Sequence, residues 1–175
     1  MEKGFVDPKE ALSQLDLTPN MIVADFGSGS GGWAIPLAKL LKEGKVFAID
    51  ILKEPLSALK SRANSERVYN IQTVCSNVEE KRGSKLGDSS VNLVLMTNLL
   101  FQVGNKTAII SEAKRILKSG GKILVVDWLP KSFLGPEKDR ISPEEVKKIA
   151  KENGLEFEKE FKTGLHHYGV ILRKP

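Results

Sequence analysis

The sequence has a single cysteine and no long apolar run, and these two absences exclude several classes of protein. One thiol, Cys75, can form neither an internal disulfide nor a zinc cluster built on cysteines. No apolar segment approaches the roughly 20 residues that a membrane-spanning helix requires. The first five residues also lack the apolar core of a signal peptide. We therefore expect a cytoplasmic protein in a reducing compartment, without a membrane span.

The sequence also lacks any run of five like charges, and its aromatic content is only 6%. The 27 basic residues exceed the 22 acidic ones, which gives a formal net charge of +5 at pH 7. Nucleic-acid-binding surfaces usually concentrate basic residues beside stacking aromatics, so this dispersed excess favours an ordinary lysine-rich surface. With 175 residues, 41% of them hydrophobic, we expect one domain over residues 1–175, as a monomer or homodimer.

Short apolar segments alternate with helical patterns along the chain. Such alternation predicts a parallel sheet with crossover helices, and Thr163-Gly164 predicts an antiparallel hairpin near the C-terminal end. The predicted strands are 21–26, 45–50, 69–74, 91–97, 122–127, 156–162 and 166–173. Helices are predicted to start near Pro8 and Pro143 and to cover 32–42, 53–63 and 106–118, the last ended by Gly120-Gly121.

A glycine-rich turn joins the first predicted strand of the sheet to the helix after it. Residues 23–32 read Val-Ala-Asp-Phe-Gly-Ser-Gly-Ser-Gly-Gly. Glycine permits a sharp turn and lets a ligand approach the main chain closely. The next strand ends in Asp50, where a carboxylate can accept hydrogen bonds from the two hydroxyls of an adenosine ribose. The turn and Asp50 together predict a ligand that contains a nucleoside.

Two classes of cofactor fit this glycine spacing. Gly27, Gly29 and Gly32 match the G-x-G-x-x-G pattern of nicotinamide and flavin binders, so a nicotinamide-dependent oxidoreductase is one alternative. Asp25, two residues before the first glycine, would repel a doubly negative pyrophosphate in a site of low dielectric constant. The same carboxylate suits S-adenosylmethionine, which has no phosphate and carries an ammonium and a sulfonium.

With these segments, the chain resembles the class I S-adenosylmethionine-dependent methyltransferases, in particular the small type 11 or ubiquinone/menaquinone-biosynthesis-like group. The resemblance extends from about Met21 to Arg173. It depends most on the glycine turn, on 46–50, and on 112–124, which resembles the helix, glycine turn and fifth strand of that group. It implies an α/β, Rossmann-like, doubly wound sheet of seven strands in the order 3-2-1-4-5-7-6, with strand 7 antiparallel.

The resemblance also implies which residues bind the cofactor. Asp50 would hold the ribose, and Ile51 would pack on the adenine face. Asn77 stands where the family often has an acid that reaches the adenine amino group; its side-chain oxygen can accept the same hydrogen bond, although a turn-forming asparagine is the alternative. The rest of the predicted set is Asp25, Gly27, Ser28, Gly29, Gly31 and Thr97.

No catalytic residue is required by the reaction that the resemblance implies. Methyl transfer is an in-line displacement at a sulfonium, so positioning can supply much of the rate, and a base helps only if the acceptor is a hydroxyl or an acidic carbon. The family's strand order brings His166 and His167 near Asp127, and strand alternation lets one of the histidines share its face. We predict an imidazole oriented by Asp127; two structural histidines are the alternative.

The sequence does not identify the methyl acceptor. Trp128 and Phe133, with Lys131 and Arg140 offering charge, are candidates for an acceptor pocket in the irregular stretch 128–141. Residues 98–101 read Asn-Leu-Leu-Phe and lack the N/D-P-P-Y/F motif, which disfavours methylation of base amino groups. The leading hypothesis is transfer to a small molecule, quinone-like or otherwise aromatic. RNA or protein acceptors, and a cofactor-binding module without transfer activity, are the alternatives.

Overall fold

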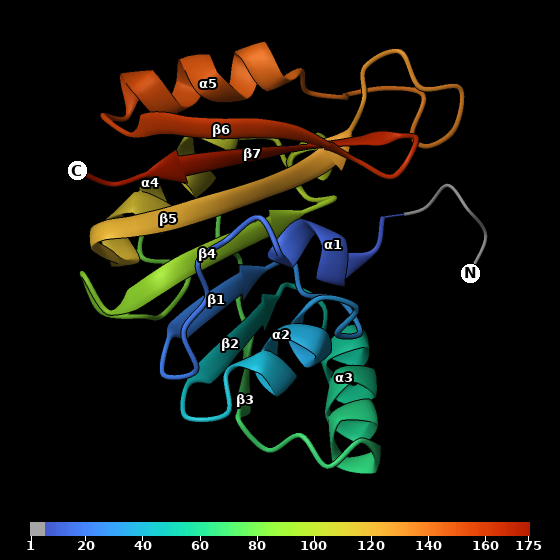
Figure 1. The fold of residues 1–175 in the computed structure, drawn as a ribbon, viewed down its shortest axis with the longest axis vertical. Helices are drawn as coiled ribbons and strands as arrows, with labels where there is room; N and C mark the ends of the chain where they lie inside the picture. Colours follow the sequence, from blue (N-terminus) through green and yellow to red (C-terminus); the bar gives the residue numbers. More distant parts are fainter. Residues whose placement is uncertain (1–5) are drawn as a thin grey trace.

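The computed structural model describes residues 6–175, and the first five residues, where we predict no signal-peptide core, lie outside this range. Its centre is a seven-stranded sheet in the order β3-β2-β1-β4-β5-β7-β6 (Figure 1). The strands are β1 (Ile22–Phe26), β2 (Lys45–Asp50), β3 (Ile71–Cys75), β4 (Val91–Thr97), β5 (Leu117–Trp128), β6 (Glu156–Thr163) and β7 (His167–Arg173). The first five strands are parallel, and β7 is antiparallel to both β5 and β6. The predicted fold class and strand order are confirmed.

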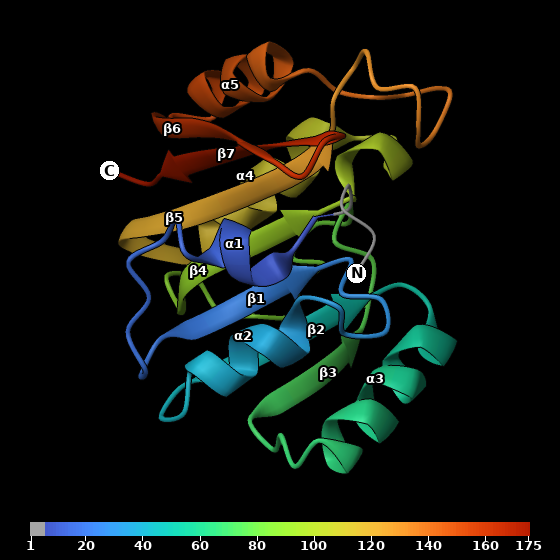
Figure 2. The ribbon, with the colours of Figure 1, turned by 45° about the vertical axis from the view of Figure 1, so that its right-hand side comes forward.

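Helices cover both faces of the sheet, as Figure 2 shows. One face packs against α1 (Pro8–Leu12), α2 (Ala34–Leu40) and α3 (Lys53–Ser65), and the other against α4 (Lys106–Ile116) and α5 (Pro143–Glu152). Alternation along β1 separates the two cores, because Val23 packs into the first while Ala24 and Phe26 pack into the second. No helix within residues 6–175 is long and apolar enough to cross a membrane.

Side chains that precede two of the helices determine where those helices begin. Asp7 accepts a hydrogen bond from the backbone N–H of Lys9, and Ser142 accepts one from Glu145. Proline occupies the first turn of both α1 and α5, where its missing N–H leaves no hydrogen bond unmade. Both predicted helix starts are confirmed.

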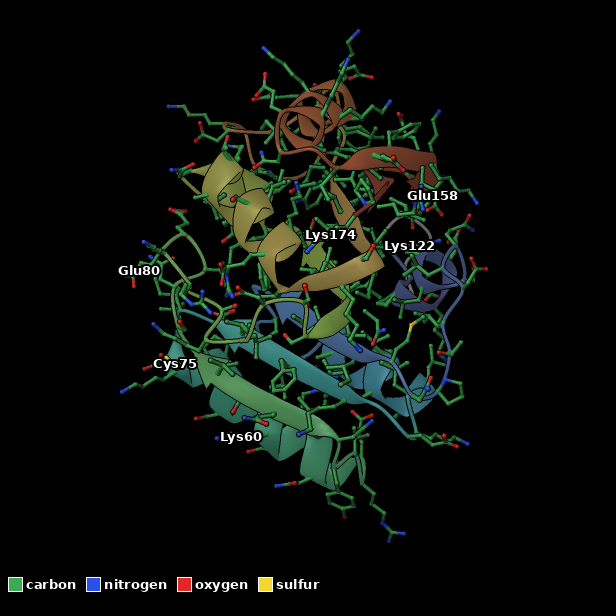
Figure 3. The ribbon with its side chains drawn as sticks, turned by 90° about the vertical axis from the view of Figure 1, so that its left-hand side faces the viewer. Lys60, Cys75, Glu80, Lys122, Glu158 and Lys174 are labelled. Carbon is green, nitrogen blue, oxygen red and sulfur yellow. The ribbon has the colours of Figure 1, made fainter. Side chains whose placement is uncertain are left out.

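The predicted end of the third crossover helix was wrong. Helix α4 ends at Ile116, and Gly120 and Gly121 lie inside β5, which begins at Leu117. Leu117 is fully buried and pairs with Val91 of β4. The ammonium of Lys174, labelled in Figure 3, donates to the backbone oxygens of Lys114 and Leu117 and thereby satisfies carbonyls at the end of the helix. These contacts join segments distant in the sequence, so a local glycine signal did not reveal them.

The strand order creates a crevice at the carboxyl ends of β1 and β4. From β1 the chain continues to β2 on one side, while β4, β5 and β7 extend the sheet on the other. In open α/β sheets ligands bind at such a switch point, outside the carboxyl ends of the strands. The glycine turn follows β1 directly, so the fold places it at this crevice.

Candidate functional site

A cavity of about 400 Å³ lies at the carboxyl ends of the first four strands. Its wall is formed by the segments that follow these strands. Five of the predicted cofactor residues line it: Gly27, Gly29, Asp50, Ile51 and Asn77. The lining residues that the sequence did not single out are Ile49, Leu52, Pro55, Ser76, Val78, Glu79, Leu99, Gln102 and Val103. The cavity is within the size range of small-molecule sites.

Two backbone donors fix the carboxylate of Asp50 at the edge of this cavity. Its Oδ2 accepts a 2.9 Å hydrogen bond from the N–H of Gly29, and its Oδ1 accepts one of 3.0 Å from Leu52. Each carboxylate oxygen can accept two hydrogen bonds, so both keep capacity for a further donor. The glycine turn therefore orients Asp50 as well as bounding the cavity, and a diol is a suitable partner for the remaining lone pairs.

The glycines of the turn have different surroundings. Gly29 has φ +52°, and a Cβ added there would meet nothing within 4 Å, so its backbone faces open space. Gly31 has φ +90°, and a Cβ added there would lie 2.9 Å from Cγ of Leu59 and 3.1 Å from Cδ1 of Ile35. Gly31 does not line the cavity but lets α2 and α3 pack closely. Only the earlier part of the turn faces the cavity.

Asp25 is fully buried and does not line the cavity, and neither of its carboxylate oxygens has a hydrogen-bond partner within residues 6–175. Burial raises the pKa of Asp25 to about 8, and the nearby Asp50 carboxylate contributes to the same shift. The hydroxyl of Ser28 is likewise buried without a partner, and Thr97 is buried at the end of β4. A buried acceptor without a donor is unfavourable, so these residues suit a ligand that brings cationic N–H donors.

The loop after β3 contributes to the cavity wall both Asn77, which was predicted from the sequence, and Glu79, which was not. Oδ1 of Asn77 accepts a 3.0 Å hydrogen bond from the N–H of Glu79, which is the turn-forming role considered as the alternative, while Asn77 still lines the cavity. Glu79 lines the cavity too, and its Oε1 accepts a 3.0 Å hydrogen bond from the N–H of Gly104. In the sequence, only the position of Glu79 two residues after Asn77 could have indicated that it lines the cavity. Ile51, 62% exposed, offers an uncovered apolar face.

The predicted pair between a histidine and Asp127 is not formed. In the antiparallel register Asp127 lies opposite Tyr168, and His167 lies opposite Trp128. Successive residues of a strand point to opposite faces, so His167 and Asp127 are separated by the sheet. Asp127 is fully buried and accepts hydrogen bonds from the N–H groups of Leu100 (3.0 Å) and Trp128 (2.8 Å). Burial raises the pKa of Asp127 to about 6, although these donors oppose the rise.

Both histidines have other partners. Nε2 of His167 lies 3.0 Å from Oδ1 of Asn98, its ring is 4.1 Å from that of Trp128, and its Nδ1 is buried without a partner within the described residues. Burial lowers the pKa of His167 to about 4, and His166 adds to the effect, so His167 is neutral at pH 7. Nδ1 of His166 lies 2.9 Å from Oγ of Ser132.

Four side chains from four strands lie on one face of the sheet near the carboxyl ends of its parallel strands. The pairing of β1 with β4, of β4 with β5 and of β5 with β7 puts four residues on the same face, namely Asp25, Thr97, Trp128 and His167. This is the face covered by α1 and α2. Arg140, considered above as a source of charge for an acceptor, instead donates to backbone carbonyls of its own loop.

Comparisons with known proteins agree with this geometry. Residues 17–163 match a family model described as a methyltransferase domain. A demethylmenaquinone methyltransferase from Bacillus cereus is 24% identical over 128 residues, which cover 73% of this chain and 53% of the relative, so the chain spans about half the length of the curated relatives it matches.

Two solved structures are similar over almost the whole chain. A SAM-dependent methyltransferase from Aquifex aeolicus has a TM-score of 0.86 and 25% identity, covering 95% of this chain and 89% of that one. A protein placed among the type 11 methyltransferases, from Sulfolobus solfataricus, has a TM-score of 0.78 and 26% identity, covering 97% and 94%. The family model, the strand order and the cavity agree, and we conclude that the chain belongs to the class I S-adenosylmethionine-dependent methyltransferases, with S-adenosylmethionine as its cofactor.

Proposed function

We propose that this chain transfers the methyl group of S-adenosylmethionine to a small-molecule acceptor. The observation that carries the proposal is the carboxylate of Asp50, fixed by the turn N–H of Gly29 at the edge of a cavity of about 400 Å³. This arrangement suits the ribose of an adenosyl group. The demethylmenaquinone methyltransferases among the relatives support a small-molecule acceptor.

In this proposal, residues of the cavity hold the adenosyl part of the cofactor. Asp50 accepts hydrogen bonds from the ribose hydroxyls, and the exposed side chain of Ile51 packs on the adenine ring. Asn77 faces the adenine edge. Gly29 leaves the main chain uncovered, so that the ligand can approach it closely, while Gly27 lets Leu99 of the cavity wall pack against the turn.

The other end of the cofactor is assigned to Asp25, Ser28 and Thr97. The carboxylate of Asp25 and the hydroxyl of Ser28 have no hydrogen-bond partner among residues 6–175. Asp25 is proposed to attract the ammonium group, and Ser28 to hydrogen-bond to the same amino-acid end. Thr97 lies on the same sheet face at the end of the neighbouring strand. Gly31 is proposed to shape the turn through its packing rather than by contact.

Bound S-adenosylmethionine supplies an electrophilic methyl group, and the residues of this chain orient the reactants. His167 is neutral at pH 7 and is held by Asn98 and Trp128 on the face that also carries Asp25. We assign it to the boundary between cofactor and acceptor. Asp127 lies on the opposite face and stabilises the segment at Leu100 through a backbone hydrogen bond. His166 is assigned to the acceptor side.

The cofactor assignment is tested by calorimetric titration with S-adenosylmethionine, S-adenosylhomocysteine and NAD. We expect the first two to bind and NAD not to bind, because a pyrophosphate would bring negative charge, and no cationic N–H donor, to the buried carboxyl of Asp25. Asp50→Ala should weaken S-adenosylmethionine binding at least about tenfold, or roughly 1.4 kcal/mol. Asp16→Ala, at a fully exposed side chain, is the matched control. Binding of NAD alone, or unchanged affinity in folded Asp50→Ala, would contradict the assignment.

The acceptor class is tested by following the label from S-adenosylmethionine with a radioactive methyl group. The protein is incubated with a cell extract, which is then separated into solvent-extractable small molecules, RNA and protein. The proposal expects label in the solvent-extractable fraction, with about tenfold less transferred by Asp50→Ala when S-adenosylmethionine is well below its dissociation constant. Label that enters RNA or protein would replace the small-molecule assignment by one of the macromolecular alternatives.

A further inference from the structure

The loop between β5 and α5 is organised around the guanidinium of Arg140. An arginine side chain carries five N–H donors in a rigid planar group, which here are directed at the loop's own backbone oxygens. The acceptors are the carbonyls of Leu129 (3.2 Å), Pro130 (3.3 Å), Ser132, Leu134 (2.8 Å) and Pro136. The loop also rests on Trp128, because a Cβ at Gly135 would lie 2.4 Å from the indole ring. The loop is therefore a preformed unit with its own internal support.

This loop borders a second cavity, of about 380 Å³. The remaining walls are Pro143 and Glu144 at the start of α5, and Leu165 and His166 in the turn between β6 and β7. Figures 1 and 2 both show this turn and the loop at the same end of the sheet. Phe133 is 87% exposed and Leu165 is 69% exposed. Large apolar side chains left uncovered around a cavity favour a flat apolar ligand.

The hydrogen bonds of Ser132 determine the tautomer of His166. Oγ of Ser132 donates to the backbone oxygen of Leu134 at 2.9 Å and accepts from the N–H of the same residue at 3.2 Å. A hydroxyl has one proton, so the 2.9 Å contact with Nδ1 of His166 requires that Nδ1 donates. In a neutral imidazole Nε2 then carries the lone pair, and it makes no hydrogen bond to the described residues. A donor from a ligand can therefore pair with it.

The second cavity lies at the same end of the sheet as the cofactor cavity. Leu99, which follows β4, lines the cofactor cavity, and Leu129, which follows β5, lines the second cavity. Because β4 and β5 are adjacent parallel strands, the two cavities lie at the carboxyl ends of neighbouring strands. The cofactor site is therefore next along the sheet from the second cavity. The charged residues of its wall, Lys131 and Glu144, cancel each other, which favours an uncharged ligand.

From these contacts we propose that the second cavity binds the methyl acceptor, an uncharged aromatic compound whose ring lies between Phe133 and Leu165 and whose hydroxyl donates a hydrogen bond to Nε2 of His166. The inference rests on the proposed function. As the acceptor forms its bond to the methyl group, the S–CH3 bond breaks with its electron pair left on sulfur, and the hydroxyl proton passes to Nε2. The products are neutral S-adenosylhomocysteine, the methylated acceptor and an imidazolium.

The probe that we choose is 2-naphthol, titrated in the presence of saturating S-adenosylhomocysteine. 2-Methoxynaphthalene has the same rings but no hydroxyl donor, so it should bind about three- to tenfold more weakly. In His166→Phe the two compounds should bind equally. Phe133→Ala should weaken both, whereas Phe157→Ala, at a half-exposed phenylalanine on β6 outside the cavity, should change neither.

The titration of S-adenosylhomocysteine is measured first. If it does not bind, the proposed function fails; if it binds and 2-naphthol does not, only the acceptor site is overturned. Equal affinities of the two naphthalenes for the unaltered protein, or a difference that persists in His166→Phe, would also overturn it. Should His166→Phe fail to fold, the tautomer of His166 is measured by nitrogen NMR of the unaltered protein. The proposal requires the proton on Nδ1, and a proton on Nε2 contradicts it.

Discussion

At the scale of single residues, Asp25 is the most unusual group in the site. Its carboxyl is fully buried, has no hydrogen-bond partner within residues 6–175, and has a pKa raised to about 8 by burial and then by Asp50. Without a ligand it is mostly protonated at pH 7. A cation placed beside it favours the ionised form, so binding of the cofactor's ammonium should release a proton from Asp25.

This linkage predicts that affinity for S-adenosylmethionine rises from pH 6 to pH 8. Above about pH 8 the rise should stop, because the ligand's own α-amino group, with an ordinary pKa of about 7.7–8.0, loses its charge. Calorimetry at pH 7 in two buffers with different ionisation enthalpies measures the released proton directly. Asp25→Asn should bind more weakly and release none. Equal proton release by both proteins would show that Asp25 does not face the ammonium.

His167 should make the stability of the protein sensitive to acid. Its folded-state pKa of about 4 lies below the ordinary value of 6.5, so the unfolded chain binds the proton more tightly. The stabilising contribution is complete above pH 6.5 and is lost as the pH falls toward 4. The free-energy gap between the unaltered protein and His167→Gln, from denaturant unfolding at several pH values, should therefore narrow as the pH falls through this window. A gap that is constant from pH 7 to pH 4 would contradict the assignment.

The positions of single residues were predictable where they follow from chain order alone. Asp50 ends the strand after the glycine turn, and its position at the cavity followed from that spacing. The link between His167 and Asp127 depended on the register between β5 and β7, and a difference of one residue places the two side chains on opposite faces. Nothing local in the sequence determines that register.

At the scale of elements, the turn between β1 and α2 contains two glycines with different purposes. Gly31→Ala should lower the free energy of unfolding by about 2–4 kcal/mol, since the added methyl group would press on Leu59 and Ile35 and the backbone is left-handed. Gly29→Ala should cost only about 1–2 kcal/mol, for the backbone alone. It should, however, weaken S-adenosylmethionine binding at least about tenfold, because its methyl group projects into open space beside Asp50.

The comparison needs both measurements on both variants. Denaturant unfolding gives the stability, and calorimetry under conditions where each variant is folded gives the affinity. We expect Gly31→Ala to be the less stable protein and Gly29→Ala the weaker binder. The reverse order would mean that the cofactor lies along the later part of the turn.

The ends of helices were predictable where the capping side chain is next to the helix in the sequence. They were missed where the side chain that satisfies the helix end is distant in the sequence. Asp7 and Ser142 are local signals, and the helices they precede begin as predicted. The end of α4 depends on Lys174, which comes 58 residues after Ile116 in the numbering and reaches the helix only once β7 has joined the sheet. Such a contact exists only in the folded chain.

At the scale of the whole molecule, the sheet order brings residues from both halves of the chain to the same end of the sheet. The cofactor cavity takes residues from Gly27 to Val103, while the second cavity takes them from Leu129 to His166. The resemblance to the methyltransferases implied this strand order, and the order creates the crevice beside β1 and β4. The wall of the second cavity was not predictable, because it depends on how Arg140 folds its loop.

Because the proposed cofactor residues join β1, β2 and β4, ligand binding should stabilise the whole fold against heat. A ligand present at 100 times its dissociation constant adds about 2.7 kcal/mol, which for a chain of this length corresponds to a melting temperature higher by about 5–10 °C. Thermal unfolding with S-adenosylhomocysteine measures this shift. At the same ligand concentration Asp50→Ala, with a dissociation constant about ten times higher, should gain only about 1.4 kcal/mol and roughly half the shift. Equal shifts in the two proteins would mean that Asp50 does not hold the ligand, whereas a shift in neither would mean that the cavity at the strand ends is not the adenosyl site.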